Sequence, residues 1–300
     1  MLTRRGILLL TGWAGLLCAS RAVAQARISV VATFSILGDL VRNVGGDEVE
    51  VATLVGANAN VHVYSPTPAD AKSLAAAKAV FVNGLGLEGW LTRLIAASGT
   101  KATVVVCSDG IRPLEREDQQ RVGHEVMDPH AWQSVANAKI YVANIRDGLS
   151  RAEPSKKDVY YANATSYLSK LDALEKEVSE VIGEISPERR KIITTHAAFG
   201  YFADAYGMQF ISPEGVSSDA EPSARDVAEI IAQIKKQHIP AVFLENVVDP
   251  RLLQEIAGET GAKMGGTLYS DALSEANGPA ASYIELMRSN IRQFAKALKS

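Results

Sequence analysis

Cysteine is scarce in this sequence, which contains only Cys18 and Cys107 among its 300 residues. Cys18 belongs to an N-terminal segment that we expect to be removed, so Cys107 would remain alone and no intramolecular disulfide could form. Cys107 ends the apolar run Thr103 to Val106, a setting typical of a small buried residue. These features exclude a disulfide-stapled scaffold and favour a structural thiol over a nucleophile or a ligand.

A strong excess of charge is also missing. The chain carries 31 basic and 34 acidic residues, for a formal net charge of −3. A surface that binds nucleic acid needs a clustered surplus of Lys and Arg to neutralise phosphates, so we exclude nucleic acid as a partner. The composition, 47% hydrophobic and 22% charged, is that of an ordinary globular protein whose length suffices for two modest domains.

The N-terminus lacks an apolar run long enough to span a membrane. The run from Ile7 to Leu17 is shorter than the ~20 residues that a membrane-spanning helix needs. Arg4 and Arg5 precede this run, and Ala24-Gln25-Ala26 provides the small-x-small pattern that a signal peptidase accepts. We predict that residues 1–26 are a cleaved signal peptide and that the mature protein is periplasmic.

Two features of this segment leave alternatives open. The adjacent arginines are compatible with twin-arginine export and with ordinary Sec export. Lipid attachment at Cys18 is the alternative to a free protein, but the preceding Gly15-Leu16-Leu17 departs from the usual lipoprotein pattern of Leu followed by small residues. We expect a free, monomeric protein.

Short β-branched runs alternate along the chain with segments of helical spacing, such as Ala69 to Ala77 and Val227 to Ile234. Strands that alternate with helices predict an α/β fold with mainly parallel sheets. The predicted strands are Ile28–Phe34, Val49–Val55, Ala79–Asn83, Thr103–Cys107, Lys191–Thr195, Gln209–Ile211, Ala241–Leu244 and Gly266–Tyr269. The polar stretch Glu115 to Arg121 is predicted to be a solvated loop.

The longest helical pattern runs from about Pro154 to Ile185, with apolar residues at steps of three or four. Ser186-Pro187 is its stop signal. A helix of roughly 45 Å exceeds what a crossover within one small lobe requires, so we predict that it joins two lobes. The predicted organisation is an N-terminal lobe at 27–153, a linking helix at 154–187 and a C-terminal lobe at 188–300. A long crossover helix within one domain is the alternative.

Three histidines and one aspartate lie where an α/β fold presents ligands. His62 and His196 follow predicted strands, His130 precedes a helix start, and Asp271 lies just beyond the last predicted strand. Each residue alone is weak support, because a single His is more often hydrogen-bonded or exposed. Two of the four precede the long helix and two follow it, so two facing lobes could bring them into one cleft. Three imidazoles and one carboxylate suit tetrahedral zinc, whereas manganese prefers more oxygen.

Three other polar residues carry weaker signals. Glu245 ends a predicted strand and is a candidate to orient a ligand imidazole, although a surface carboxylate or a partner for Arg251 is an equal alternative. His124 lies in a polar loop and is expected to be exposed rather than to deliver metal. His238 is expected at a helix end, beside the terminal carbonyls.

At these residues the sequence resembles the metal-specific solute-binding proteins of bacterial ABC transporters, the zinc and manganese uptake family. The matching segments cover Asn60–Asp70, Met127–Trp132, Thr194–Phe202 and Leu268–Leu273, with one candidate ligand in each. The resemblance implies two α/β lobes joined by a long rigid helix, metal held between them, and a membrane permease as partner.

The resemblance also bears on which metal is carried. Histidine at the third ligand position, here His196, is typical of zinc members, whereas manganese members tend to carry Glu there. Zinc is therefore the expected cargo, with manganese or iron as the alternative. Many zinc members have a histidine-rich loop before the second ligand, and this sequence offers only His124, so the resemblance does not imply loop-assisted capture.

Two other functions remain as alternatives. A zinc hydrolase needs three protein ligands and an open position for water, but four protein ligands would close that position. His124, Glu125 and His130 also lack metalloprotease spacing, because Pro129 interrupts the helix on which two ligands would stand four apart. We therefore expect no enzymatic activity. A metal-dependent surface adhesin is the other alternative.

Overall fold

The structure is a computed structural model that describes residues 27–117, 125–218 and 223–299. The predicted signal peptide and His124 lie outside the described residues. Within the described part of the chain, no helix is long and apolar enough to cross a membrane.

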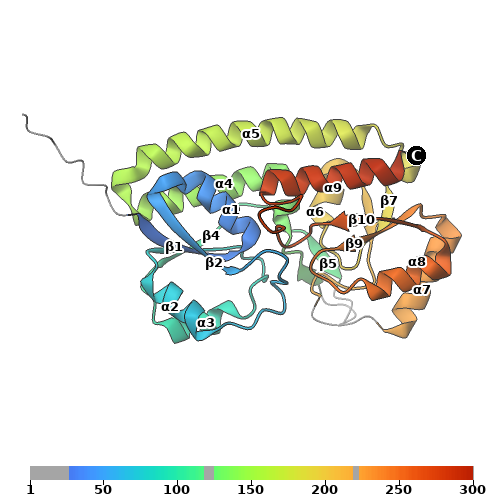
Figure 1. The fold of residues 1–300 in the computed structure, drawn as a ribbon, viewed down its shortest axis with the longest axis horizontal. Coiled ribbons are helices and arrows are strands. Elements are labelled where there is room, and N and C mark those ends of the chain that lie inside the picture. The colour runs from blue at the N-terminus through green and yellow to red at the C-terminus, as the bar shows by residue number, and fades with distance from the viewer. Residues whose placement is uncertain (1–26, 118–124, 219–222, 300) are drawn as a thin grey trace, which may run out of the picture.

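Two parallel four-stranded sheets form the framework (Figure 1). The α/β fold class with parallel sheets is thereby confirmed. The first sheet has the order β2-β1-β3-β4 and the second the order β10-β9-β7-β8. The strands are β1 Ile28–Phe34, β2 Val49–Val55, β3 Ala79–Val82, β4 Thr103–Val106, β7 Lys191–Ile193, β8 Gln209–Ile211, β9 Ala241–Glu245 and β10 Lys263–Leu268.

Most observed strands match the predicted runs to within one or two residues, but β10 begins at Lys263 rather than at Gly266. Its pairing with β9 shifts register between Met264 and Thr267. Gly265 lies against the Phe243 ring so closely that a Cβ there would come within 2.4 Å of the ring. None of the missed residues, Lys263, Met264 and Gly265, is β-branched, which explains why the sequence pattern did not mark them.

Helices pack around both sheets and connect the strands. Their boundaries follow capping signals: Thr67 and Asp70 form a capping box at the start of α2, and Ser223 and Asp226 do so at α7. His238 is the C-cap of α7, and its backbone N–H donates to Ile234, as predicted. The α-helices besides α5 are α1 Ser35–Gly45, α2 Pro68–Ala76, α3 Leu91–Ser98, α4 Val135–Ala152, α6 Gly200–Tyr206, α7 Ala224–Gln237, α8 Arg251–Thr260 and α9 Tyr283–Leu298.

The long helix α5 (Lys157–Gly183) runs along one side of the molecule, past both sheets (Figure 1). A 3₁₀ turn at Pro154–Lys156 precedes it, and Pro187 begins another turn just after its end. Its apolar stripe is buried against α1, α4 and α9. The predicted linking helix is confirmed, while the exact lobe boundaries stay a prediction.

The prediction of a solvated loop from Glu115 to Arg121 is wrong at its start. Glu115–Glu117 forms β5, which pairs antiparallel with β6 (Glu125–Met127). Backbone hydrogen bonds hold such a ribbon, so it needs no apolar alternation in its sequence. Residues 118–121 lie outside the described part. The expectation for Cys107 is met, because its thiol is free and buried at the end of β4.

Candidate metal centre

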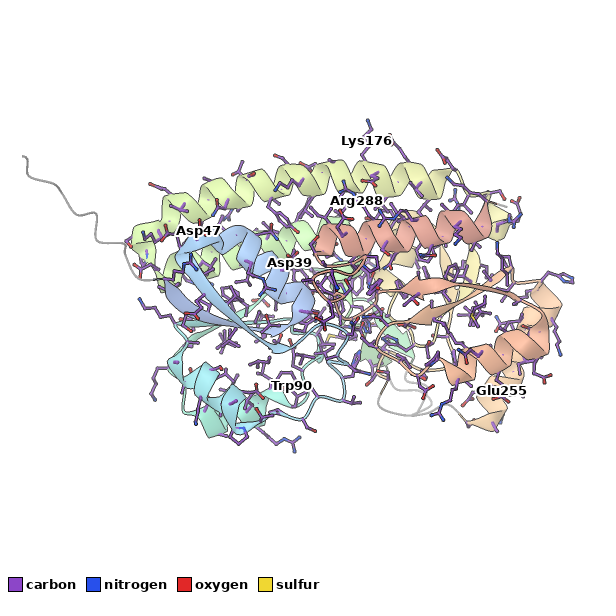
Figure 2. All side chains as sticks on the ribbon, in the orientation of Figure 1. Asp39, Asp47, Trp90, Lys176, Glu255 and Arg288 are labelled. Carbon is purple, nitrogen blue, oxygen red and sulfur yellow. The ribbon has the colours of Figure 1, made fainter. Side chains whose placement is uncertain are left out.

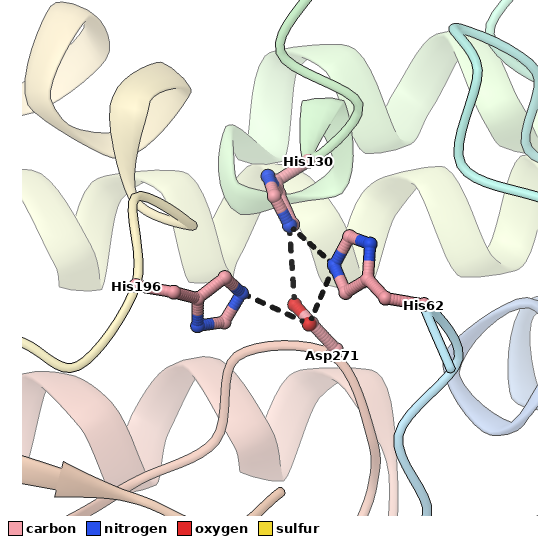
Figure 3. Close-up of side chains that lie close together, drawn as sticks. All are labelled: His62, His130, His196 and Asp271. Carbon is pink, nitrogen blue, oxygen red and sulfur yellow. Dashed lines mark hydrogen bonds and ion pairs between the residues drawn. The ribbon is translucent and has the colours of Figure 1, made fainter. Parts of the chain in front are cut away.

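His62, His130, His196 and Asp271 come together in one cluster (Figure 3). Each offers one ligand atom, and these atoms all lie within 4.8 Å of one another. The side chain of His62 is 4% exposed, and the other three side chains are fully buried. The four residues predicted from the sequence therefore share one site, with His62 at its outer edge.

The spacing of the candidate ligand atoms fits a single ion. His62 Nε2 lies 3.2 Å from His130 Nε2 and 3.2 Å from Asp271 Oδ2. His196 Nε2 lies 3.1 Å from Asp271 Oδ2, and His130 Nε2 lies 3.5 Å from Asp271 Oδ1. Ligand atoms at about 2.0–2.1 Å from a tetrahedral ion lie roughly 3.3–3.4 Å apart. The cluster can therefore surround one divalent cation after small side-chain adjustments.

The buried ionisable groups of the site shift one another's pKa values. Burial acts to raise the pKa of Asp271, but His196 and His130 outweigh it and hold this pKa well below the usual range. Burial acts to lower the pKa of His196, but the carboxylates of Glu245 and Asp271 raise it well above the usual value. For His62, burial dominates and lowers the pKa. An ionised carboxylate faces the imidazoles, and a metal ion would replace protons there.

Of the residues that the structure describes, the carboxylate of Asp271 contacts only the three imidazoles of the cluster. Beyond its close contacts with the three imidazoles, neither carboxylate oxygen accepts a hydrogen bond from any described residue. A buried carboxylate in a folded protein is normally hydrogen-bonded or paired with a cation. The donor set of this cluster is thus chemically suited to a divalent metal.

Glu245 orients the His196 ring. Its Oε2 lies 2.7 Å from His196 Nδ1, and its Oε1 accepts the backbone N–H groups of Thr195 and His196 at 2.8 and 3.0 Å. The ring is thereby turned with Nε2 toward the cluster. The predicted contact between Glu245 and a candidate ligand imidazole is present. Arg251 forms its ion pair with Asp249.

Asp128 plays the same part for His130, and the sequence-based prediction missed it. Asp128 Oδ1 lies 2.8 Å from His130 Nδ1 and accepts the His130 backbone N–H at 3.0 Å. Both side chains are fully buried. The available signal was the Asp-x-His spacing, which lets an Asp side chain turn back onto the backbone two residues later.

Asp271 is positioned by residues from the other half of the chain. Trp132 Nε1 and Gln133 Nε2 both donate to the carbonyl of Ser270, at 2.9 and 2.8 Å. Leu273 N donates to Ser35 Oγ at 2.9 Å on the other side of Asp271. The segment that follows His130 thus holds the carboxylate in place, and no local pattern in the sequence indicates this.

Two α/β halves that share a buried set of three imidazoles and a carboxylate define a metal-binding protein of the solute-binding class. Residues 30–297 match the family described as ZnuA, zinc-uptake complex component A, periplasmic. The chain belongs to this family, whose members are binding proteins rather than enzymes.

The relatives of this chain are named for different metals. The chain is 32% identical over 271 residues to the manganese-binding lipoprotein MntA of Halalkalibacterium halodurans, covering 90% of this chain and 88% of the relative. It is 33% identical over 270 residues to the iron-binding protein YfeA of Yersinia pestis, covering 90% and 86%.

Solved structures agree on the fold. The periplasmic zinc-binding protein TroA from Treponema pallidum superposes with a TM-score of 0.86 at 28% identity, covering 92% of this chain and all of that one. A manganese-bound periplasmic metal-binding protein from Candidatus Liberibacter asiaticus superposes with a TM-score of 0.81 at 30% identity, covering 91% and 100%. Metal binding is thus a property of the family, while its names span zinc, manganese and iron.

Proposed function

We propose that this protein captures a divalent transition metal outside the cytoplasm, zinc by preference, and delivers it to the permease of an ABC transporter. His62, His130, His196 and Asp271 are the proposed ligands. The observation that carries the proposal is their convergence within 4.8 Å, from segments on both sides of α5 in the chain.

The choice of zinc rests on the donor set. Three imidazole nitrogens and one carboxylate match the ligands that tetrahedral zinc prefers. Neighbouring ligand atoms lie 3.1–3.5 Å apart and the whole set lies within 4.8 Å, so the longer separations must shorten to place all four around one four-coordinate ion. Four protein ligands leave no open position, which suits storage and transfer of an ion rather than hydrolysis.

Manganese or iron is the second candidate cargo, and one observation favours it. Both oxygens of Asp271 face the cluster, Oδ1 toward His130 and Oδ2 toward His62 and His196. A carboxylate that gave both oxygens to the ion would add a fifth donor and more oxygen character, which suits manganese. MntA and YfeA are named for manganese and iron.

During capture, the protein ligands replace water around the ion and release the protons that compete with it. The imidazoles bind metal through an unprotonated Nε2, so an imidazolium must first lose its Nε2 proton, while the Nδ1 proton stays on the ring. His196 has a raised pKa, so its proton competes with the metal at higher pH than an ordinary histidine would. Metal affinity is therefore expected to fall as the medium is acidified.

Metal analysis of the protein purified without added metal, followed by competition between zinc and manganese, tests the proposed cargo. We expect one equivalent of bound metal and displacement of manganese by zinc. A variant with both His196 and Asp271 changed to Ala is the control and should hold neither ion. Zinc bound equally by the control would refute the assigned site, and manganese that resists zinc would establish the second cargo.

Delivery and location require separate tests. Metal uptake by cells that lack this protein should fall, and unchanged uptake would contradict the transport role. We propose cleavage after residue 26; lipid attachment at Cys18 is the alternative, since MntA is named a lipoprotein. The intact mass of the exported protein distinguishes the two forms, and light scattering tests the expected monomer.

A further inference from the structure

His62 is the candidate ligand at the outer edge of the cluster, and its segment reaches across to the other half of the molecule. Three hydrogen bonds make this connection. Asn60 Nδ2 donates to Ser218 Oγ at 2.8 Å, Asn246 Nδ2 donates to Asn58 Oδ1 at 3.0 Å, and the backbone N–H of Asn58 donates to the Leu273 carbonyl at 2.9 Å.

Asn60 lies at the centre of this segment and makes two different hydrogen bonds. Its Oδ1 accepts the backbone N–H of His62 at 2.9 Å, which fixes the turn that carries the imidazole. Its Nδ2 donates to Ser218, which belongs to the half of the chain that carries His196. The Asn60 side chain thus contacts both the loop that carries His62 and the opposite lobe.

His130, the other candidate ligand in the first half of the chain, provides a comparison for Asn60. Asp128 also stands two residues before a candidate ligand and accepts its backbone N–H. The same oxygen of Asp128 contacts the His130 ring, inside its own segment. An amide has a donor that a carboxylate lacks, and at Asn60 this donor points to the other lobe.

We infer that Asn60 is a positioning residue that couples the placement of His62 to closure of the two lobes, through its hydrogen bond with Ser218. This inference rests on the proposed metal-binding function. When this bond breaks, the His62 loop loses one of its three hydrogen bonds to the opposite half, and His62, the candidate ligand nearest the solvent, is held less firmly on the ion. Asn60 and Ser218 therefore affect the rate at which the metal dissociates.

The bond can be broken from either side. Ser218→Ala removes the partner in the opposite lobe but leaves the Asn60 contact with the His62 backbone. Asn60→Ala removes both contacts. Ser217→Ala is the matched control, because Ser217 is a neighbour of similar exposure whose side chain makes no hydrogen bond with the described residues.

Zinc release is the decisive measurement. Each zinc-loaded protein is mixed rapidly with excess chromophoric chelator, and the dissociation rate is recorded. We expect Ser218→Ala to release zinc about three- to tenfold faster, as suits loss of one neutral hydrogen bond, and Asn60→Ala to release it faster still. In the double variant, Ser218→Ala should add nothing to Asn60→Ala, because its partner is already gone.

Further measurements separate a coupling role from a general loss of stability. Thermal unfolding of metal-free Ser218→Ala, which keeps the Asn60 contact with the His62 backbone, should match that of the wild type, whereas a merely structural role would lower its unfolding temperature. The inference is overturned if Ser218→Ala releases zinc at the wild-type rate, if Ser217→Ala has the same effect, or if the two changes act independently. If the wild type itself holds no zinc, both this inference and the proposed function with zinc as cargo fail.

Discussion

Glu245 Oε2 lies 2.7 Å from His196 Nδ1, and both side chains are completely buried. This contact decides which ring nitrogen faces the cluster, because a nitrogen engaged by the carboxylate is held away from the ion. The same carboxyl group also accepts two backbone N–H groups of the His196 loop. Glu245 therefore fixes both the loop and the ring that it carries.

Replacing this carboxylate should weaken metal binding without removing a ligand. We expect Glu245→Gln to lower zinc affinity roughly 10- to 100-fold, the range found for groups that orient metal-bound histidines. Chelator competition measures the change. Glu255→Gln is the control, since Glu255 is exposed on α8 (Figure 2). Wild-type affinity in Glu245→Gln would show that the orientation of His196 does not depend on this contact.

Removing a ligand itself should cost more affinity. His196→Ala and Asp271→Ala are each expected to weaken zinc binding by more than the ~100-fold limit of an orienting change. Isothermal titration in competition with a chelator gives the affinities, and circular dichroism checks that each variant stays folded. A variant that keeps wild-type affinity would remove that residue from the proposed site.

Asp39 should make stability depend on pH in a defined direction. Burial raises its pKa, although it accepts the backbone N–H of Tyr283 at the start of α9. A raised pKa means that the folded state holds the proton more tightly than the unfolded chain, so ionised Asp39 destabilises the fold above its folded pKa. This destabilisation disappears as the pH falls below the ordinary value of 3.8.

Asp39→Asn should therefore stabilise the metal-free protein at neutral pH, and the gain should shrink as the pH is lowered through the raised pKa. Urea unfolding at several pH values measures the free energy of unfolding. Asp47→Asn is the control, because the Asp47 side chain is fully exposed in the 3₁₀ turn Gly46–Glu48, which follows α1 (Figure 2). A gain that grows on acidification would have the wrong sign and would reject the prediction.

Phe294 should be a major contributor to the packing of α9 on the second sheet. The centroid of its buried ring lies 5.5 Å from the ring centroids of Phe202 and Phe243 and 5.9 Å from that of Phe210. We expect Phe294→Ala to reduce the free energy of unfolding by about 3–5 kcal/mol, from lost burial and the cavity left behind. Denaturant unfolding is the measurement, with the exposed Lys296→Ala as control. A loss below about 1 kcal/mol would mean that neighbouring rings fill the space.

Much of the framework could be predicted from the sequence, because its signals are local. The β-branched runs mark β1, β2 and β8 to the residue, and the apolar spacing after Pro154 marks α5. Period-two and period-3.6 patterns arise within one element, so they need no knowledge of distant parts of the chain. The four candidate ligands follow from the same logic, since each lies beside a predicted strand or helix.

What the sequence by itself determined was therefore which residues stand at the ends of elements and which chemistry they offer. Only the tertiary structure decided that Asp128 and Glu245 turn the rings, that Trp132 and Gln133 hold the Asp271 loop, and that Asn60 reaches Ser218. Apart from the two-residue step from Asp128 to His130, these contacts join segments tens or more than a hundred residues apart. Their pairing depends on how the lobes pack, and packing leaves no periodic trace in either segment.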